Sequence, residues 1–411
     1  MNTRILSFVV FFVMLMIAPK IVEPAYDLFL VAFAMLMGLQ SEWHGIPLRL
    51  RIPASIRTLL AGVVLLIILD VTFNQAPAAR DVLRDLGALL AFFVGRYMFV
   101  AYRDKDFQTE ALIGMSHMGV IVSLYTIGAA LLAYAAGVSA YLWRGAYVPW
   151  AHTWLPFVLV TNVFLAAIDR EHATRWQRRA ALSVLATVAS LSRTDLLLDM
   201  GFGLAMLWSY REQFLLRFAG ILKIAGVLMV VAAATPFLLK LDVVQQRISR
   251  GVGDSDQSLG WRFLENVSLF DHFMRASNYE LAFGFGLGAR LPLPPGILDF
   301  DGNTSIPNLH NSLGTIALKF GIMGLVILAW YAWRVSRKSF TFKDPAGEPY
   351  RRAGRWIVLL CFGKALTLHG LTEWGHVVFF GIGCMLMLNH TRDDRVREPV
   401  PTASTSPAPA T

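Results

Sequence analysis

The sequence predicts an all-α, polytopic integral membrane protein with about twelve transmembrane helices and one large loop containing short helices. Of its 411 residues, 56% are hydrophobic and only 16% are charged, and the mean hydropathy is +0.54. A soluble domain of this length with so few charges would expose large apolar patches. The apolar residues instead form blocks of about 15–25, the length that crosses a hydrocarbon core of about 30 Å.

These apolar blocks define the order of elements along the chain. Residues 1–239 carry the first nine spans, 240–308 form a large hydrophilic loop, 309–390 carry three more spans, and 391–411 form a disordered tail rich in Pro, Ser, Thr and Ala. The stretch 5–18 is assigned to the first membrane helix rather than to a signal peptide. The predicted spans lie near 5–22, 24–40, 55–72, 82–100, 112–137, 151–168, 180–193, 195–210, 219–239, 309–333, 355–370 and 373–390.

Basic residues mark alternate connections between these spans. Most Lys and Arg residues lie in the even-numbered connections and the tail, whereas each short odd-numbered connection carries one or none. Because basic loops remain in the cytoplasm, both termini are predicted to be cytoplasmic and the 240–308 loop to face outward. The net charge of +9 then reflects topology and contacts with anionic membrane lipids, and not nucleic-acid binding.

His310 and Asn311 lie where the large loop meets the tenth predicted span. If Asn311 or Ser312 caps that helix, its N-terminus presents free backbone N–H groups and a partial positive charge. Such a terminus attracts an anion such as diphosphate and favours a neutral histidine that can accept a proton. The alternative is an interfacial histidine that caps a helix and has no role in chemistry.

Two arginines are candidate ligands for an anion. Arg193, next to Ser192, lies in the short turn Leu191–Asp195, which keeps its guanidinium near the membrane surface, and an ionisable group at that depth suggests function. An arginine there can also simply snorkel to the headgroups. Arg262 lies near the start of the amphipathic stretch Gly260–Met274, predicted to form a helix along the membrane surface. Arginine suits phosphate because its planar fork donates two charge-assisted bonds. The predicted topology places both arginines and His310 on the outer face, where we expect them to meet in one cavity.

Two further patterns indicate neither a nucleotide nor a metal. The GFGLG segment at 284–288 lacks a surrounding strand–helix unit, so it is predicted to be a turn and not a dinucleotide-binding loop. The D-x-D pairs at 254–256 and 299–301 lack the further carboxylate of a calcium loop. Neither a metal nor a cofactor is therefore expected.

Lys319 lies nine residues into the tenth predicted span. An ionised lysine at that depth needs a partner or water. Asp199 is a candidate partner on the basis of depth alone.

The spacing of His310, Asn311, Gly321 and Gly324 fits the pattern H-[NSQ]-x9-G-x2-[GTY]. In this pattern the chain resembles the ligase branch of the O-antigen ligase and polymerase superfamily of bacterial envelope glycosyltransferases. The GFGLG segment, the Ser192–Arg193 turn, the arginine of GWRF and the large outer loop before the motif look like that family as well. The similarity in organisation covers residues 5–390, whereas the specific motifs cover only a small part of them.

The resemblance implies an inverting, metal-independent glycosyltransferase without a cofactor. Such an enzyme moves a polysaccharide from undecaprenyl diphosphate to a lipid A–core sugar hydroxyl, at the periplasmic face of the bacterial inner membrane. By position, Arg193 and Arg262 would bind the diphosphate, and His310 would accept the proton of the attacking hydroxyl. Further candidate substrate contacts are Ser192, Arg290 and Asn311.

Two alternatives remain open at this point. A polymerase of O-antigen or exopolysaccharide would share the donor and the constellation but would use a growing glycan as acceptor. A transporter of lipid-linked glycans or small anions is favoured only by the number of spans and by the intramembrane charges.

Overall fold

The computed structural model describes the chain in several stretches and leaves the first eighty residues outside them. The described residues are 105–137, 153–190, 192–209, 257–297, 302–341, 347–367 and 374–389, with single positions at 81, 82, 84, 85, 88, 371 and 372. The predicted spans near 5–22, 24–40, 55–72 and 219–239, nearly all of 82–100, and the predicted tail lie outside them.

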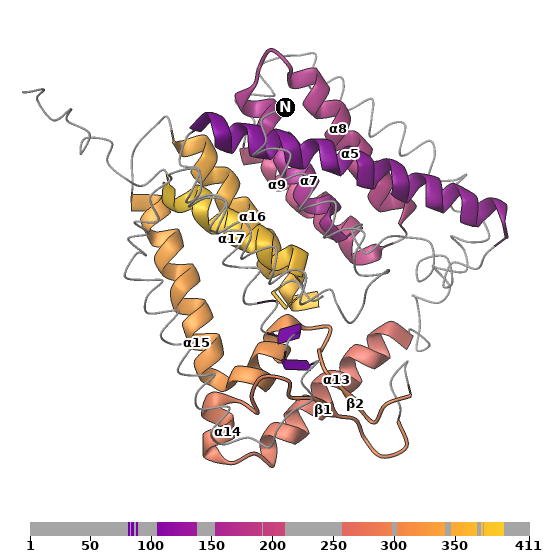
Figure 1. The fold of residues 1–411 in the computed structure, drawn as a ribbon, viewed down its shortest axis with the longest axis vertical. Coiled ribbons are helices and arrows are strands. Elements are labelled where there is room, and N and C mark those ends of the chain that lie inside the picture. The colour runs from indigo at the N-terminus through magenta and orange to yellow at the C-terminus, as the bar shows by residue number, and fades with distance from the viewer. Residues whose placement is uncertain are drawn as a thin grey trace, which may run out of the picture.

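Helices make up most of the described residues and occupy most of the described parts of the predicted spans. The predicted amphipathic stretch of the large loop is also a helix, α13, and a short second helix, α14, follows it. In chain order the helices are α5 (Lys105–Ala135), α7 (Leu155–Ile168), α8 (Ala173–Ala189), α9 (Arg193–Ser209), α13 (Gln257–Met274), α14 (Asn278–Phe283), α15 (Ser312–Thr341), α16 (Glu348–Thr367) and α17 (Trp374–Asn389) (Figure 1).

Two described helices contain a stretch that is long and apolar enough to cross a membrane. These stretches are Leu112–Ala135 of α5 and Ser312–Phe340 of α15, and shorter apolar stretches fill α7 and much of α17. The outer surfaces of α5 and α15 are themselves apolar, with Leu132 of α5 and Phe340 of α15 largely exposed. An exposed apolar surface of this kind suits a lipid environment better than water.

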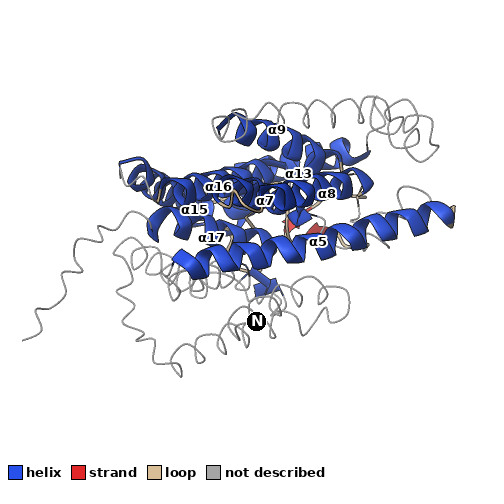
Figure 2. Cartoon of the chain, turned by 90° about the horizontal axis from the view of Figure 1, so that it is seen from above, coloured by secondary structure: helices blue, strands red, loops and turns tan. Residues whose placement is uncertain are grey.

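Helix α7 is the centre of the described helices. Every residue from Leu155 to Ala167 is buried, which is typical of a helix that is apolar on all sides and needs neighbours all round. Figure 2 shows α5 on one side of α7 and α9 on the other, while α8 and α16 also pack against α7. Pro156 lies in the first turn of α7, where its missing N–H removes no helical hydrogen bond.

A two-stranded antiparallel pair lies in the loop between α14 and α15. Strand β1 (Leu291–Pro292) pairs with β2 (Ser305–Ile306), with Leu291 opposite Ile306. This pair departs from the all-α prediction. Two-residue strands are too short to show the alternation that reveals a strand in a sequence, and one of them contains a proline.

Helix α15 is broken at Gly321, whose φ of 61° and ψ of −161° are not helical. The backbone of the GFGLG segment lies against this break. The N–H of Phe285 donates to the carbonyl of Leu318 at 2.8 Å, and the N–H of Gly286 donates to the carbonyl of Lys319 at 3.0 Å. The segment is a turn, as predicted, and its backbone donors satisfy carbonyls next to the break.

Candidate functional site

The candidate site is centred on His310, which lies just before the first turn of α15. Asn311 caps this helix: its Oδ1 accepts from the backbone N–H of Leu313 at 3.0 Å and from that of Gly314 at 3.3 Å. The cap places His310 next to the N-terminus of α15, the positive end of the helix dipole.

A carboxylate from α13 holds His310 at two points. Glu265 Oε1 lies 2.7 Å from His310 Nδ1, and Glu265 Oε2 accepts from the His310 backbone N–H at 2.9 Å. The Glu265 side chain is 3% exposed, whereas that of His310 is 35% exposed. The acid is thus inside the protein, and the ring stands between it and the surface.

Glu265 is a site residue that the sequence reasoning missed. It lies within the stretch predicted to be an amphipathic helix, where a single glutamate usually faces water. Its partner is 45 residues away in the chain. The one available signal was its place three residues after Arg262, on the same side of a helix.

Arg262 lies in the second turn of α13 and is partly buried. Its Nε is buried and has no hydrogen-bond partner among the residues that the structure describes. Because side chains three positions apart on a helix are neighbours, Arg262 and Glu265 lie on adjoining parts of one surface of α13. Helix α13 therefore carries both a cation and the acid that holds His310.

Ser192 and Arg193 lie at the start of α9. Arg193 is the first residue of the helix, and Ser192 is its cap: the Ser192 hydroxyl donates to Asp195 Oδ2 at 2.7 Å and accepts from the Asp195 N–H at 3.4 Å. This hydroxyl, predicted as a candidate substrate contact, is therefore engaged within the protein.

The first turns of α9 and α15 lie at the same end of the helices. Lys364, in the last turn of α16, forms a fully buried ion pair with Asp195 of α9 at 2.5 Å. Shortly after α16 ends, the N–H of Leu371 donates to the hydroxyl of Ser312, the first residue of α15, at 3.1 Å. The end of α16 thus links the start of α9, with Ser192 and Arg193, to the helix start beside His310.

Arg290 is held by contacts within the loop and with the segment around residue 81. Its Nη1 lies 3.1 Å from Asp81 Oδ2, its Nε donates to the Ser305 hydroxyl at 3.0 Å, and its Nη2 donates to the Ser305 carbonyl at 2.9 Å. These contacts tie β2 to the residue just before β1. The guanidinium of Arg290 thus has partners within the protein, Asp81 and Ser305. Its contact with substrate stays a prediction.

Lys319 pairs with Asp85, and not with Asp199 as depth alone had suggested. Its Nζ also donates to Asn308 Oδ1 at 2.9 Å, while Asp199 accepts from the Thr187 hydroxyl at 2.6 Å. Depth in a span does not fix the direction in which a side chain leaves its helix, so two groups at one level can face different neighbours.

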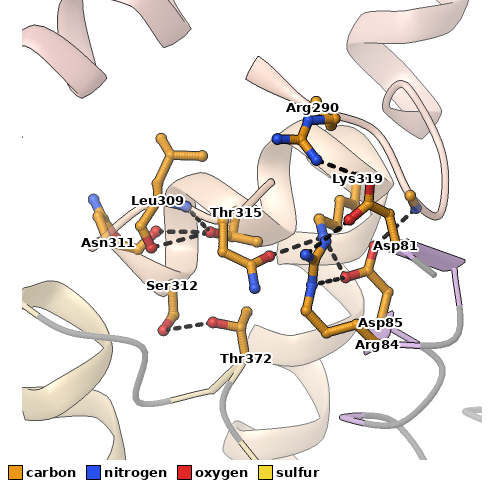
Figure 3. A network of polar contacts seen from close by, with 12 residues as sticks. Asp81, Arg84, Asp85, Arg290, Leu309, Asn311, Ser312, Thr315, Lys319 and Thr372 are labelled. Atoms are coloured by element: carbon orange, nitrogen blue, oxygen red, sulfur yellow. Dashed lines mark hydrogen bonds and ion pairs between the residues drawn. The ribbon is translucent and has the colours of Figure 1, made fainter. Parts of the chain in front are cut away.

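The Asp85 carboxylate joins three parts of the chain. Besides pairing with Lys319 on α15, it accepts at Oδ2 from the N–H of Gly288 at 2.8 Å. Figure 3 shows Arg84 and Asp81 next to this pair, with Arg84 3.5 Å from Asp85 and 2.9 Å from Asp81. This network fastens the end of the GFGLG segment to α15 at Lys319, about two helical turns from the start of the helix.

Basic residues gather at the opposite end of the helices. Arg352, near the start of α16, donates to the carbonyl of Ser209, the last residue of α9, at 2.9 Å. Arg355 donates to the hydroxyl of Ser339, close to the end of α15, at 2.9 Å. The His310 end and the basic end are therefore separated by the length of the apolar helices.

The last turn of α13 packs on the GFGLG segment through His272. Its ring stacks on that of Phe285, with centroids 4.1 Å apart and planes at 29°. Burial lowers the pKa of His272 below its ordinary value of 6.5; Arg275 adds to this effect, and the Glu280 and Asp271 carboxylates oppose it. The neutral ring is therefore the form that this packing favours.

Among the described residues, no group of three or more His, Cys, Asp or Glu side chains could hold a metal ion. The D-x-D pairs at 254–256 and 299–301 include positions outside the described residues. The chemistry that the described groups offer is proton transfer by a histidine next to a carboxylate, on whose helix an arginine lies three residues away.

Comparison of the sequence with protein-family models and with curated proteins found no match. The resemblance to O-antigen ligases therefore rests on the sequence motifs, chiefly the pattern of His310, Asn311, Gly321 and Gly324.

Proposed function

We propose that the protein is an O-antigen ligase, an inverting and metal-independent glycosyltransferase with undecaprenyl-diphosphate-linked polysaccharide as donor. The observation that carries the proposal is the pairing of His310 with the buried Glu265, on a helix that also bears Arg262. A partly exposed histidine held by an acid, on whose helix an arginine also lies, is equipped to take a proton while an anionic group leaves.

In the proposed reaction, the hydroxyl of a lipid A–core sugar attacks C1 of the donor sugar. The hydroxyl proton passes to His310 Nε2 as the new C1–O bond forms. The bond between C1 and the diphosphate oxygen breaks on the opposite face, which inverts the anomeric centre, and undecaprenyl diphosphate leaves with the bonding electron pair. A base in this role typically contributes roughly 10²–10⁴ in rate.

Arg262 and Arg193 are assigned to the diphosphate. Each charge-assisted bond from a guanidinium to a phosphate oxygen contributes about 1.5–3 kcal/mol. Support for Arg262 comes from its place on α13, three residues from Glu265, and from its buried Nε without a described partner. Support for Arg193 comes from its position at the start of α9, at the same end of the helices as His310.

We place the site at the periplasmic face of the inner membrane, in a protein of about twelve spans with cytoplasmic termini. The positions of Arg352 and Arg355 at the end of the helices away from His310 support this orientation, because basic residues are enriched on the cytoplasmic side. Membrane lipids surround the apolar faces of α5 and α15 in this arrangement.

The test is the lipopolysaccharide of a strain from which the gene is deleted, separated on a gel. A ligase predicts lipid A–core without any attached O-antigen, restored by the wild-type gene and not by a His310→Ala variant that inserts normally into the membrane. A single attached repeat would identify a polymerase instead. A ladder of normal length would contradict both assignments, and uptake or flipping of a glycan lipid without transfer would point to a transporter.

A further inference from the structure

We infer that Glu265 is the positioning residue of His310: it fixes which ring nitrogen carries the proton and where the ring stands. The inference deepens the proposed function and rests on it for the catalytic role of His310. Its geometric part, the control of the ring by Glu265, stands on the two contacts alone.

The tautomer follows from the chemistry of the carboxylate. An ionised carboxylate only accepts hydrogen bonds, so the 2.7 Å contact between Glu265 Oε1 and His310 Nδ1 requires a proton on Nδ1. In the neutral ring the acceptor lone pair is then on Nε2, at the far edge from Glu265. Nε2 is therefore the atom that can take a proton from an acceptor hydroxyl.

The second oxygen makes the arrangement stiffer than a single hydrogen bond would. Glu265 Oε2 accepts from the His310 backbone N–H at 2.9 Å, so one acid holds both the ring and the chain that carries it. A ring fixed at Nδ1 and at its own backbone has little freedom to turn. When His310 takes the proton, the adjacent carboxylate stabilises the imidazolium that forms.

The packing of α13 on α15 keeps Glu265 in position next to His310. The helices touch one turn further along α13, where Leu269 lies against Gly314 in the first turn of α15. A Cβ added to Gly314 would lie 3.2 Å from Leu269 Cδ2, so a glycine leaves room for this approach. The contact fixes α13 relative to the start of α15, and with it the place of Glu265 beside His310.

The test uses the full-length protein in lipid nanodiscs, labelled with ¹⁵N-histidine, and magic-angle-spinning NMR at neutral pH. The His310 signals are identified by their loss in His310→Ala. The wild type should show His310 protonated at Nδ1. Glu265→Gln should abolish that preference, because an amide oxygen can accept only one of the two bonds and the amide NH₂ faces the other nitrogen. Glu265→Asp, which keeps the charge, should restore part of it.

Activity is measured on the same preparations with a polyprenyl-diphosphate-linked glycan and lipid A–core. Glu265→Gln should lower kcat by roughly 10²–10⁴-fold with little change in the KM for donor, and Glu265→Asp should recover part of that loss. Asp271→Asn is the matched control, since Asp271 is an exposed carboxylate on the same helix, and it should change neither readout.

The experiments distinguish a failure of the proposed glycan transfer from a failure of the positioning role of Glu265. If Glu265→Gln shifts the His310 tautomer but the wild type transfers no glycan, the proposed function is wrong and the positioning role stands. If the wild type carries its proton on Nε2, or if Glu265→Gln leaves the His310 signals unchanged, the positioning role is overturned whatever the activity.

Discussion

Gly284 and Gly321 meet backbone to backbone at the break in helix α15. A Cβ on Gly321 would lie 2.5 Å from the backbone nitrogen of Gly284, and a Cβ on Gly284 would lie 2.4 Å from the carbonyl carbon of Lys319. Both glycines have a positive φ, 83° at Gly284 and 61° at Gly321. The two motifs that looked separate in the sequence, GFGLG and the Gly321 of the histidine pattern, are therefore two halves of one contact.

Gly321→Ala should destabilise the protein markedly. The left-handed backbone alone costs a non-glycine residue roughly 1–2 kcal/mol, and the methyl group would also overlap the carbonyl oxygen of Ala282, 2.5 Å from the Cβ position. We expect a lower apparent Tm in detergent and less folded protein on size-exclusion chromatography. Gly128→Ala on α5 is the control, because nothing lies within 4 Å of its Cβ position. Equal Tm values for the two variants would show that the contact is unimportant.

The buried pair of Lys319 and Asp85 should show strong coupling. Lys319→Met removes the closer of the two described cations at the buried Asp85 carboxylate and leaves only Arg84, 3.5 Å away. Removing one partner of a buried ion pair typically costs about 3–5 kcal/mol, and the remaining arginine should keep the loss at or below the lower end of that range. Lys319→Met combined with Asp85→Asn should be more stable than Lys319→Met alone, because asparagine keeps an oxygen for the Gly288 N–H and removes the charge. Apparent Tm values for the single and double variants measure the coupling. A double variant less stable than Lys319→Met would contradict the role of the pair.

Arg262 and Arg275 provide a matched pair of arginines on one loop. Arg262→Ala should raise the KM for the donor and lower kcat, since one lost phosphate bond of about 1.5–3 kcal/mol is a factor of roughly 10–150. Arg275 is 77% exposed and pairs with Asp271 on the surface, so Arg275→Ala should retain wild-type kinetics. Arg193→Ala should resemble Arg262→Ala. Similar losses in Arg262→Ala and Arg275→Ala would indicate a general effect of loop charge.

The packing of His272 on Phe285 should weaken in acid. Because the pKa of His272 is lowered in the folded protein, the unfolded state binds the proton more readily, so the stabilisation is present above about pH 6.5 and declines as the pH falls below it. Hydrogen exchange of residues 284–290, corrected for intrinsic rates, should show less protection at pH 5 than at pH 7.5.

His272→Phe is the control for that pH dependence. Phenylalanine can stack on Phe285 but cannot take a proton, so the protection of residues 284–290 should depend much less on pH. If the variant loses protection in acid as the wild type does, another group is responsible.

Much of the helical architecture follows from the sequence, because apolar blocks and caps are local signals. The α13 helix was predicted from its periodicity, and the cap at the start of α15 was narrowed to Asn311 or Ser312. The two-residue strands were not predicted, since they have no length over which an alternating pattern can repeat. The break at Gly321 was also missed, because no proline marks it and its cause, the backbone of the GFGLG segment, lies more than 30 residues earlier in the chain.

The candidate site was predictable only in part, for a different reason. His310 and Arg262 are conspicuous as a polar junction and as the cation of an amphipathic helix. Glu265 and Asp85 become meaningful only through partners 45 and 234 residues away. Sequence position gave Lys319 a depth but not a direction, which is why Asp199 was the wrong partner.

The most direct test of the account is glycan transfer by purified wild-type protein and His310→Ala in nanodiscs. The reaction contains a polyprenyl-diphosphate-linked glycan of known anomeric configuration, lipid A–core and a metal chelator. We expect the wild type to form a lipid A–core glycan with inverted configuration and to release polyprenyl diphosphate, and the equally well folded His310→Ala variant to be slower by at least roughly 10²-fold. Wild-type rates in His310→Ala, or no transfer by the wild type, would contradict this expectation.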